Sequence, residues 1–176
     1  MDPVDLFERG SAWTKDKIAG AKDKLDAQTP CEEWKVRDVV NHLINGLEDY
    51  FQKAARGEEG TYPAPTPPNI IDGDDPVKRY EQTRQATLEA FKSADQKEAM
   101  RTMGIAFVDQ VVHGTDIAKA TGQDATIPED LAEAAFGMVN GNITDENRGQ
   151  GFKAEVKVPE DAPTQDKLLA YLGRKP

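Results

Sequence analysis

The chain contains two histidines, His42 and His113, and each lies four residues after an aspartate, Asp38 and Asp109 respectively. In a helix, residues four apart project from one face about one turn apart. That geometry allows one helix to offer a carboxylate and an imidazole to a single metal ion. The same spacing is found in ordinary pairs on helix surfaces, and from spacing alone the surface pair is the more common interpretation.

A metal site built on Asp109 and His113 needs a ligand from another element, and His42 is the only other histidine. Two imidazoles and one carboxylate suit zinc, nickel or iron(II), and three protein ligands leave positions open for water or substrate. In the metal interpretation the ligands are therefore His42, Asp109 and His113, with the surface pairs open as the alternative. Asp38 is expected to orient His42, and Asp116 to orient His113, with a solvated acid at a helix end as the alternative for Asp116.

Helical periodicity of apolar residues predicts the elements that carry these side chains. The predicted helices, by residue range, are 4–25, 36–55, a helix beginning at Pro76 with Asp74 or Asp75 as its cap, 97–121, 128–138 and 164–172. The apolar face of the fourth helix is expected to comprise Met100, Met103, Phe107, Val111 and Ala118. Prolines and glycines predict a long connection over 57–73, and alternation predicts an extended segment over 152–158.

These elements indicate an all-α protein with one domain over residues 1–176, a core over about 1–138 and an irregular tail over 139–176. The formal net charge of −10 disfavours binding to nucleic acid or to an anionic membrane surface. There is one cysteine, no apolar signal core and no apolar run long enough for a bilayer, so we expect a cytoplasmic protein. Cys31 is interpreted as a small buried hydrophobe, and Trp34 as a core anchor at the beginning of the second helix.

Three stretches of sequence resemble one known family. Residues 29–42, TPCEEWKVRDVVNH, resemble the first motif of the mycothiol-dependent maleylpyruvate isomerase N-terminal domain family, part of the DinB-like superfamily of metal-binding four-helix bundles. Residues 109–122, DQVVHGTDIAKATG, look like the family's second motif. Residues 152–176 are similar to the closing segment of an actinobacterial subgroup. The order of the motifs, with both histidines at the ligand positions, favours the metal site over the surface pairs.

The resemblance implies an up-down-down-up bundle with a short C-terminal extension, and a divalent ion, usually zinc, held by His42, Asp109 and His113. It also implies a low-molecular-weight thiol such as mycothiol and a small electrophilic substrate, in a transferase or isomerase reaction. Asp109 is one methylene shorter than the glutamate of the isomerase itself. Arg37 and Arg174 are the candidates for holding the thiol's carboxylate or sugar hydroxyls.

Two other functions stay open at this point. In a metal-dependent hydrolase the ion would activate water rather than a thiol. In a non-enzymatic stress protein the chain would bind a metal or ligand without turnover. The acidic surface carries no interface signal, so a homodimer stays open as an alternative to a monomer.

Overall fold

The computed structural model describes residues 2–62, 65–144, 148 and 152–176, and of residues 96–98 it describes the backbone only. The described residues form helices and no β-strand, with one isolated antiparallel bridge between Gln28 and Lys35. This confirms the predicted all-α class. Within the described part of the chain, every helix is too short or too polar to cross a bilayer.

Two compact units make up the chain, Met1–Ala125 and Thr126–Pro176. The sequence predicts that the core ends near residue 138, which is close to the C-terminal end of the helix Glu129–Val139. The two compact units meet earlier in the sequence, between residues 125 and 126, so this whole helix belongs to the second unit. The single domain over 1–176 stays a prediction.

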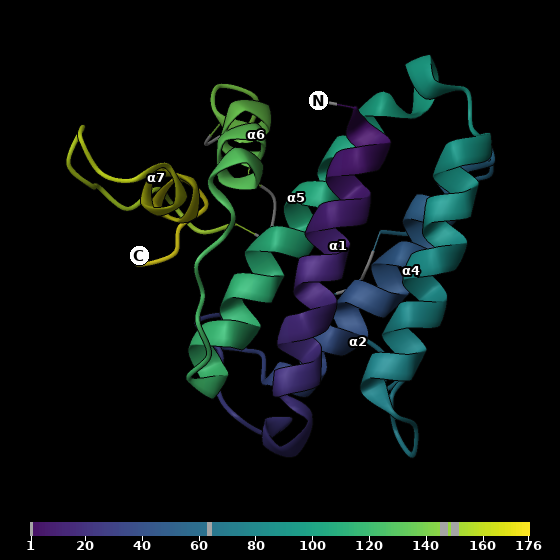
Figure 1. Ribbon diagram of the computed structural model, residues 1–176, viewed down its shortest axis with the longest axis horizontal. Helices are drawn as coiled ribbons and strands as arrows, with labels where there is room; N and C mark the ends of the chain where they lie inside the picture. Colours follow the sequence, from purple (N-terminus) through teal and green to yellow (C-terminus); the bar gives the residue numbers. More distant parts are fainter. Residues whose placement is uncertain (1, 63–64, 145–147, 149–151) are drawn as a thin grey trace. The chain divides into compact units, whose positions relative to one another are not determined.

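Four long helical segments build the first unit. Its elements are α1 (Pro3–Gly20), a 3-10 turn (Lys22–Lys24), α2 (Val36–Gly46), a π-helical segment (Leu47–Phe51), α3 (Gln52–Ala55), α4 (Pro76–Ser93) and α5 (Gln96–Thr121). α1 packs along α5 and against α4, and α2 contacts both α4 and α5 (Figure 1). The four helices predicted for this part of the chain are therefore present, and the first of them ends at Gly20 instead of near residue 25.

Local sequence signals set the beginnings of α1 and α4. The Asp2 carboxylate accepts a hydrogen bond from the backbone N–H of Val4 at 2.8 Å, and a proline follows it as the first helical residue. Asp75, one of the two predicted caps, does the same for Val77 at 2.9 Å, again directly before a proline. A proline at this position loses nothing, because the first N–H groups of a helix have no partner inside the helix.

Small residues allow α1 and α5 to approach closely. A Cβ atom on Gly114 would lie 2.6 Å from the Trp13 ring and 2.8 Å from Thr14 Oγ1. The Thr14 hydroxyl crosses to α5 and donates to the carbonyl oxygen of Gln110 at 2.8 Å. Because Gly114 directly follows His113, this contact fixes the part of α5 that carries the predicted ligands.

The predicted apolar face of α5 is correct except at its beginning. Met103, Phe107, Val111 and Ala118 are buried, whereas Met100 is 53% exposed. Ala99 takes the buried position in that turn, and the next residue is rotated by about 100° around the helix axis. Met100 therefore points to solvent.

The second long helical segment, from α2 to α3, is predicted as one helix over 36–55. It is continuous but contains the π-helical segment Leu47–Phe51. A π-helical turn widens the helix and alters the register of its carbonyl groups, and such turns are frequent at functional sites. Here the carbonyl oxygen of Asp49 accepts a hydrogen bond from the backbone N–H of Thr61 at 3.0 Å. The helix thereby holds the beginning of the long connection that follows it.

The second unit contains α6 (Glu129–Val139) and α7 (Thr164–Tyr171), close to the predicted ranges. The two helices contact each other, with the Phe136 ring edge-on to that of Tyr171 at 6.2 Å. Residues 152–158 form no strand, and the N–H of Val156 donates to the carbonyl oxygen of Ala170.

Candidate metal centre

The three predicted ligands come together inside the first unit. Nε2 of His42, from α2, lies 3.4 Å from Oδ1 of Asp109, and Nε2 of His113 lies 3.6 Å from the same oxygen. One donor atom from each residue lies within 4.8 Å of the other two. All three residues are buried, with exposed fractions of 5%, 8% and 6%. Two helices far apart in sequence thus direct two nitrogens and one carboxylate oxygen at one point.

The other nitrogen of His113 faces a second carboxylate, as predicted for Asp116. Nδ1 of His113 lies 3.0 Å from Oδ2 of Asp116, which is itself buried. A carboxylate on the far nitrogen fixes the orientation of an imidazole ligand and raises its basicity. The alternative for Asp116, a solvated acid at the end of a helix, does not fit a residue that is 1% exposed.

Asp38 does not take the position expected for it. Its Oδ2 accepts the backbone N–H of Lys35 at 2.9 Å, so it closes the first turn of α2. A carboxylate at the third position of a helix favours this contact because the N–H before it lacks a helical partner. Nδ1 of His42 is buried and has no hydrogen-bond partner among the described residues, so the expected contact with Asp38 is not found there.

The two predicted thiol-binding arginines make other contacts. Nε of Arg37 pairs with Oδ1 of Asp26 at 3.0 Å near the surface. Arg174 belongs to the second unit, where its guanidinium donates to the carbonyl oxygen of Leu172 at 3.2 Å. Their role in holding a thiol stays a prediction.

Trp34 packs against the imidazoles rather than serving only as a core anchor. Its ring centroid lies 4.7 Å from that of His42 and 5.7 Å from that of His113, with both planes tilted by 40°. Its Nε1 donates to the carbonyl oxygen of Pro65 at 2.8 Å. Trp34 therefore packs beside both histidine rings and joins them to the long connection.

The cysteine also lies beside the centre. The Sγ of Cys31 donates to Oδ2 of Asp116 at 3.4 Å, and the residue is partly exposed, not fully buried as expected. Cys31, His113 and Asp116 form a second group close enough to hold an ion, which shares His113 with the first. Cys31 of that group is partly exposed, whereas all three residues of the first group are buried. The first group is thus the better metal site.

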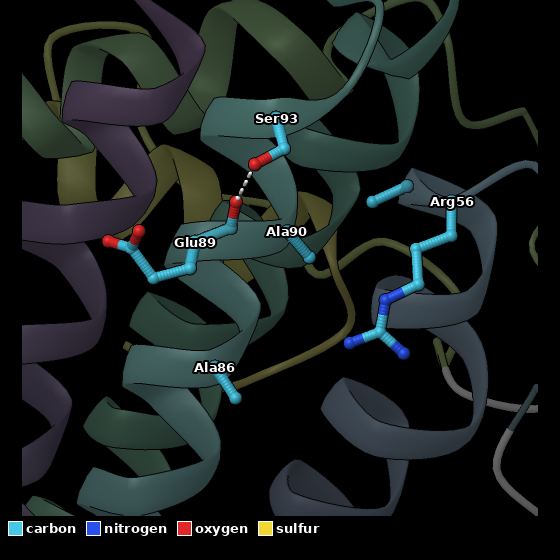
Figure 2. Close-up of a pocket in the computed structure, with 6 residues that line it drawn as sticks. Arg56, Ala86, Glu89, Ala90 and Ser93 are labelled. Carbon is cyan, nitrogen blue, oxygen red and sulfur yellow. Dashed lines mark hydrogen bonds between the residues drawn. The ribbon is translucent and has the colours of Figure 1, made fainter.

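A different hollow, of about 420 Å³, lies beside α3 and α4 (Figure 2). It is lined by Ala55, Arg56, Ala86, Glu89, Ala90 and Ser93. None of the candidate metal ligands lines it, and it contains no imidazole or thiol. Its lining combines three alanines with one arginine, one glutamate and one serine.

The donor set of the candidate centre fits a divalent ion. Two imidazole nitrogens and one carboxylate oxygen are the usual ligands of zinc in catalytic sites. Burying two carboxylates, those of Asp109 and Asp116, costs free energy unless positive charge compensates them. A divalent cation between the imidazoles would supply that charge.

Comparison with known proteins agrees with this geometry. The profile of the family described as "Mycothiol maleylpyruvate isomerase N-terminal domain" matches residues 11–118, more than half of the chain. The chain belongs to this family. The family segment includes all three candidate ligands and Asp116, and confirms the family predicted from the motifs.

Two full-length relatives come from an actinobacterium. They are "Uncharacterized protein MT0763" of Mycobacterium tuberculosis (strain CDC 1551 / Oshkosh) and "Uncharacterized protein Rv0738" of Mycobacterium tuberculosis (strain ATCC 25618 / H37Rv). Each is 27% identical over 188 residues, covering 99% of this chain and 98% of the relative. No solved structure matches the chain significantly.

The sequence analysis missed one residue whose electrostatics involve a candidate ligand, Tyr62. The Asp109 carboxylate is the largest of three causes that raise the pKa of Tyr62, and burial and Tyr50 add to it. Tyr62 lies in the family segment but in the Pro-rich connection, where apolar periodicity carries no information. Only the effect of the Asp109 charge on its pKa identifies it.

Proposed function

We propose that this chain is a metal-dependent enzyme that uses a low-molecular-weight thiol, of the mycothiol type, as a transferase or isomerase on a small electrophile. The observation that carries the proposal is the convergence of two Nε2 atoms on one carboxylate oxygen, at 3.4 and 3.6 Å, within the segment that matches the family. The convergence of three buried donor atoms on one point supports the metal site and argues against surface pairs.

His42 Nε2, Asp109 Oδ1 and His113 Nε2 would hold the ion, with zinc as the first candidate and nickel or iron(II) as alternatives. A bound divalent metal supplies Lewis-acid chemistry that favours the thiolate form of a thiol, which is its nucleophilic form. Asp116 would keep the proton of His113 on Nδ1, so that the lone pair on Nε2 faces the ion. The Trp34 ring, packed on both imidazoles, would exclude water from their faces.

We also propose the up-down-down-up order of the family for the helices of the first unit. The supporting contacts are Phe7–Phe91 and Lys22–Asp75 between α1 and α4, Glu48–Arg79 and Gln52–Thr87 between the α2–α3 run and α4, and Gly10–Phe107 and Thr14–Gln110 between α1 and α5. In the pairs between α1 and α4 the residue numbers rise along one helix and fall along the other, which fits antiparallel helices. In the pairs between α1 and α5, and between the α2–α3 run and α4, the numbers rise together, which fits parallel helices. The long connection over 57–73 then crosses between two parallel helices, which a short loop cannot join.

Thiol dependence is the test of the proposed activity. Protein freed of metal and protein reloaded with zinc would be assayed on the electrophile 1-chloro-2,4-dinitrobenzene, each with and without mycothiol. We expect turnover above background only with zinc and mycothiol together. Asp109→Asn would abolish it, and Asp49→Asn, which alters a partly exposed carboxylate held by Asn45 and Lys53, would not.

Two results would contradict the proposal. Turnover by the zinc-loaded protein without thiol, on an ester or amide substrate, would favour a hydrolase. Thiol-dependent turnover that persists in metal-free protein or in Asp109→Asn would separate the activity from the metal centre.

A further inference from the structure

A second group of donor atoms lies directly beside the candidate ligands His42, Asp109 and His113, which we call the inner centre. Sγ of Cys31, Oδ2 of Asp116 and Nδ1 of His113 all lie within 4.8 Å of one another, and we call them the outer group. The outer group shares the imidazole of His113 with the inner centre but uses its other ring nitrogen. An ion in the outer group would therefore use none of the donor atoms of the inner centre.

The distances within the outer group suit a tetrahedral metal ion. Oδ2 of Asp116 lies 3.4 Å from Sγ of Cys31 and 3.0 Å from Nδ1 of His113. Metal bonds of about 2.3 Å to sulfur and about 2.0–2.2 Å to nitrogen or oxygen, at tetrahedral angles, place sulfur and oxygen about 3.6 Å apart, and nitrogen and oxygen about 3.4 Å apart. Small rotations of the side chains are therefore enough to replace the two hydrogen bonds by three metal bonds.

The backbone holds Cys31 beside the histidine. The hydroxyl of Thr29, a buried residue, accepts a hydrogen bond from the N–H of Cys31 at 3.2 Å. The carbonyl oxygen of Cys31 accepts one from the N–H of Trp34 at 2.7 Å, and the Trp34 ring packs beside that of His113. The segment before α2 is thus tied to the histidine that the two groups share, and the thiol needs no large movement to reach an ion.

The outer group and the inner centre differ in the ions that they prefer. The inner centre offers two nitrogens and one oxygen, whereas the outer group contains a sulfur, and thiolate ligands select soft ions. Cys31 is also partly exposed, while the ligands of the inner centre are buried. An ion can therefore reach the outer group from solvent and return to it, so the occupancy of this group follows the concentration of added ion.

One neutral imidazole cannot serve both groups, because it carries one proton and one available lone pair. When an ion takes the lone pair of Nδ1 of His113, the proton lies on Nε2. That proton then points toward Oδ1 of Asp109, 3.6 Å away, and Nε2 has no lone pair for an ion in the inner centre. Binding in the outer group therefore opposes binding in the inner centre, and the opposition is reciprocal.

We propose that Cys31, Asp116 and His113 form a second metal site for thiophilic divalent ions, and that an ion bound there withdraws His113 from the inner centre. When the ion binds, the Cys31 thiol releases its proton to solvent and a metal–sulfur bond forms, while the proton of His113 moves from Nδ1 to Nε2. The second site makes the protein lose the metal of its inner centre when thiophilic ions are abundant. The inference rests on the inner metal centre of the proposed function but not on the thiol reaction.

The first test follows cadmium, a thiophilic divalent ion, by the ultraviolet absorption of the cadmium–thiolate bond. The chain has one cysteine, so this absorption band reports Cys31 alone. We expect a saturable band in metal-free wild type and none in Cys31→Ser. Asp116→Asn should weaken cadmium binding by at least about tenfold, whereas the matched control Asp38→Asn, at the first turn of α2, should leave it unchanged. His42→Ala should keep the band, because His42 belongs to the inner centre only.

The second test measures whether an ion in the outer group displaces zinc. Wild type and Cys31→Ser are each loaded with one equivalent of zinc, mixed with one equivalent of cadmium and passed through a desalting column, and their zinc content is then determined by elemental analysis. We expect wild type to lose zinc in proportion to its cadmium–thiolate band. Cys31→Ser should retain its zinc and should match wild type in melting temperature.

Each of four results would overturn the inference. Two are a wild type without the band and a band that persists in Cys31→Ser. The third is loss of the band in His42→Ala, which would assign the thiolate to the inner centre. The fourth is zinc retention by wild type that equals that of Cys31→Ser. Failure of the proposed function is read separately in the thiol assay, because the cadmium band of His42→Ala requires neither turnover nor an intact inner centre.

Discussion

The contact between Asp116 and His113 leads to a quantitative prediction for Asp116→Asn. Asparagine keeps the size of the side chain and a neutral acceptor, but it loses the charge that faces Nδ1 at 3.0 Å. The site is 1% exposed, so solvent does not screen the interaction. A hydrogen bond to a charged group contributes about 1.5–3 kcal/mol net, and asparagine retains part of it. We therefore expect Asp116→Asn to lower the zinc affinity by about 10- to 100-fold, or about 1.4–2.7 kcal/mol, which is the usual effect of removing a carboxylate that holds a metal-binding histidine.

The assay is a competition titration of zinc between the protein and a chromophoric chelator. Asp38→Asn is the matched control, because Asp38 also lies near a predicted ligand in sequence but caps the first turn of α2. We expect it to lower the free energy of unfolding by about 1 kcal/mol and to leave zinc affinity unchanged. Wild-type zinc affinity in Asp116→Asn, or an equal loss in both variants, would refute the reasoning that assigns Asp116 to the metal centre.

Two further predictions concern the scaffold. Gly114→Ala should destabilise the first unit by about 1–3 kcal/mol, because its Cβ would lie 2.6 Å from Trp13. Gly137→Ala on α6, where a Cβ meets nothing within 4 Å, should be neutral or stabilise by up to about 1 kcal/mol, and thermal unfolding followed by circular dichroism compares the two. The Arg84 guanidinium lowers the pKa of Glu81 from 4.5 to about 2. This folded-state pKa lies below the unfolded one, so the ion pair stabilises the protein above about pH 4.5 and its contribution disappears as the pH falls to about 2. Because Glu81 is about a third exposed, Glu81→Gln should cost at most about 1 kcal/mol at pH 7 in urea unfolding, and an equal cost at pH 2 would contradict the assignment.

Identical spacing in the sequence gave two different structural outcomes. Asp38–His42 and Asp109–His113 are both aspartate–histidine pairs four residues apart. Asp109 lies in the middle of α5, where the backbone N–H groups are already paired, so its carboxylate is available to the imidazoles. Asp38 lies in the first turn of α2, where an unpaired N–H captures it. Spacing alone could not distinguish them, but position relative to the helix start could have.

The helices were predictable because each carries one apolar stripe and clear end signals, as at Asp75 and Pro76. Apolar periodicity could not predict the π-helical segment Leu47–Phe51, which changes register without changing the apolar pattern. Nor could it place Trp34, whose ring contacts both imidazoles and whose Nε1 donates to Pro65 of the long connection. The division after residue 125 likewise depends on contacts between α6 and α7, which lie far apart in sequence.

The most direct test of the metal centre is elemental analysis of purified protein, prepared without a histidine tag. Wild type, His42→Ala and His113→Ala would be compared, with circular dichroism to show that each variant is folded. We predict close to one equivalent of a divalent metal in wild type and its loss in both variants. Wild type that holds no metal, and takes up none when zinc, nickel or iron(II) is added, would contradict the assignment of His42, Asp109 and His113 as ligands.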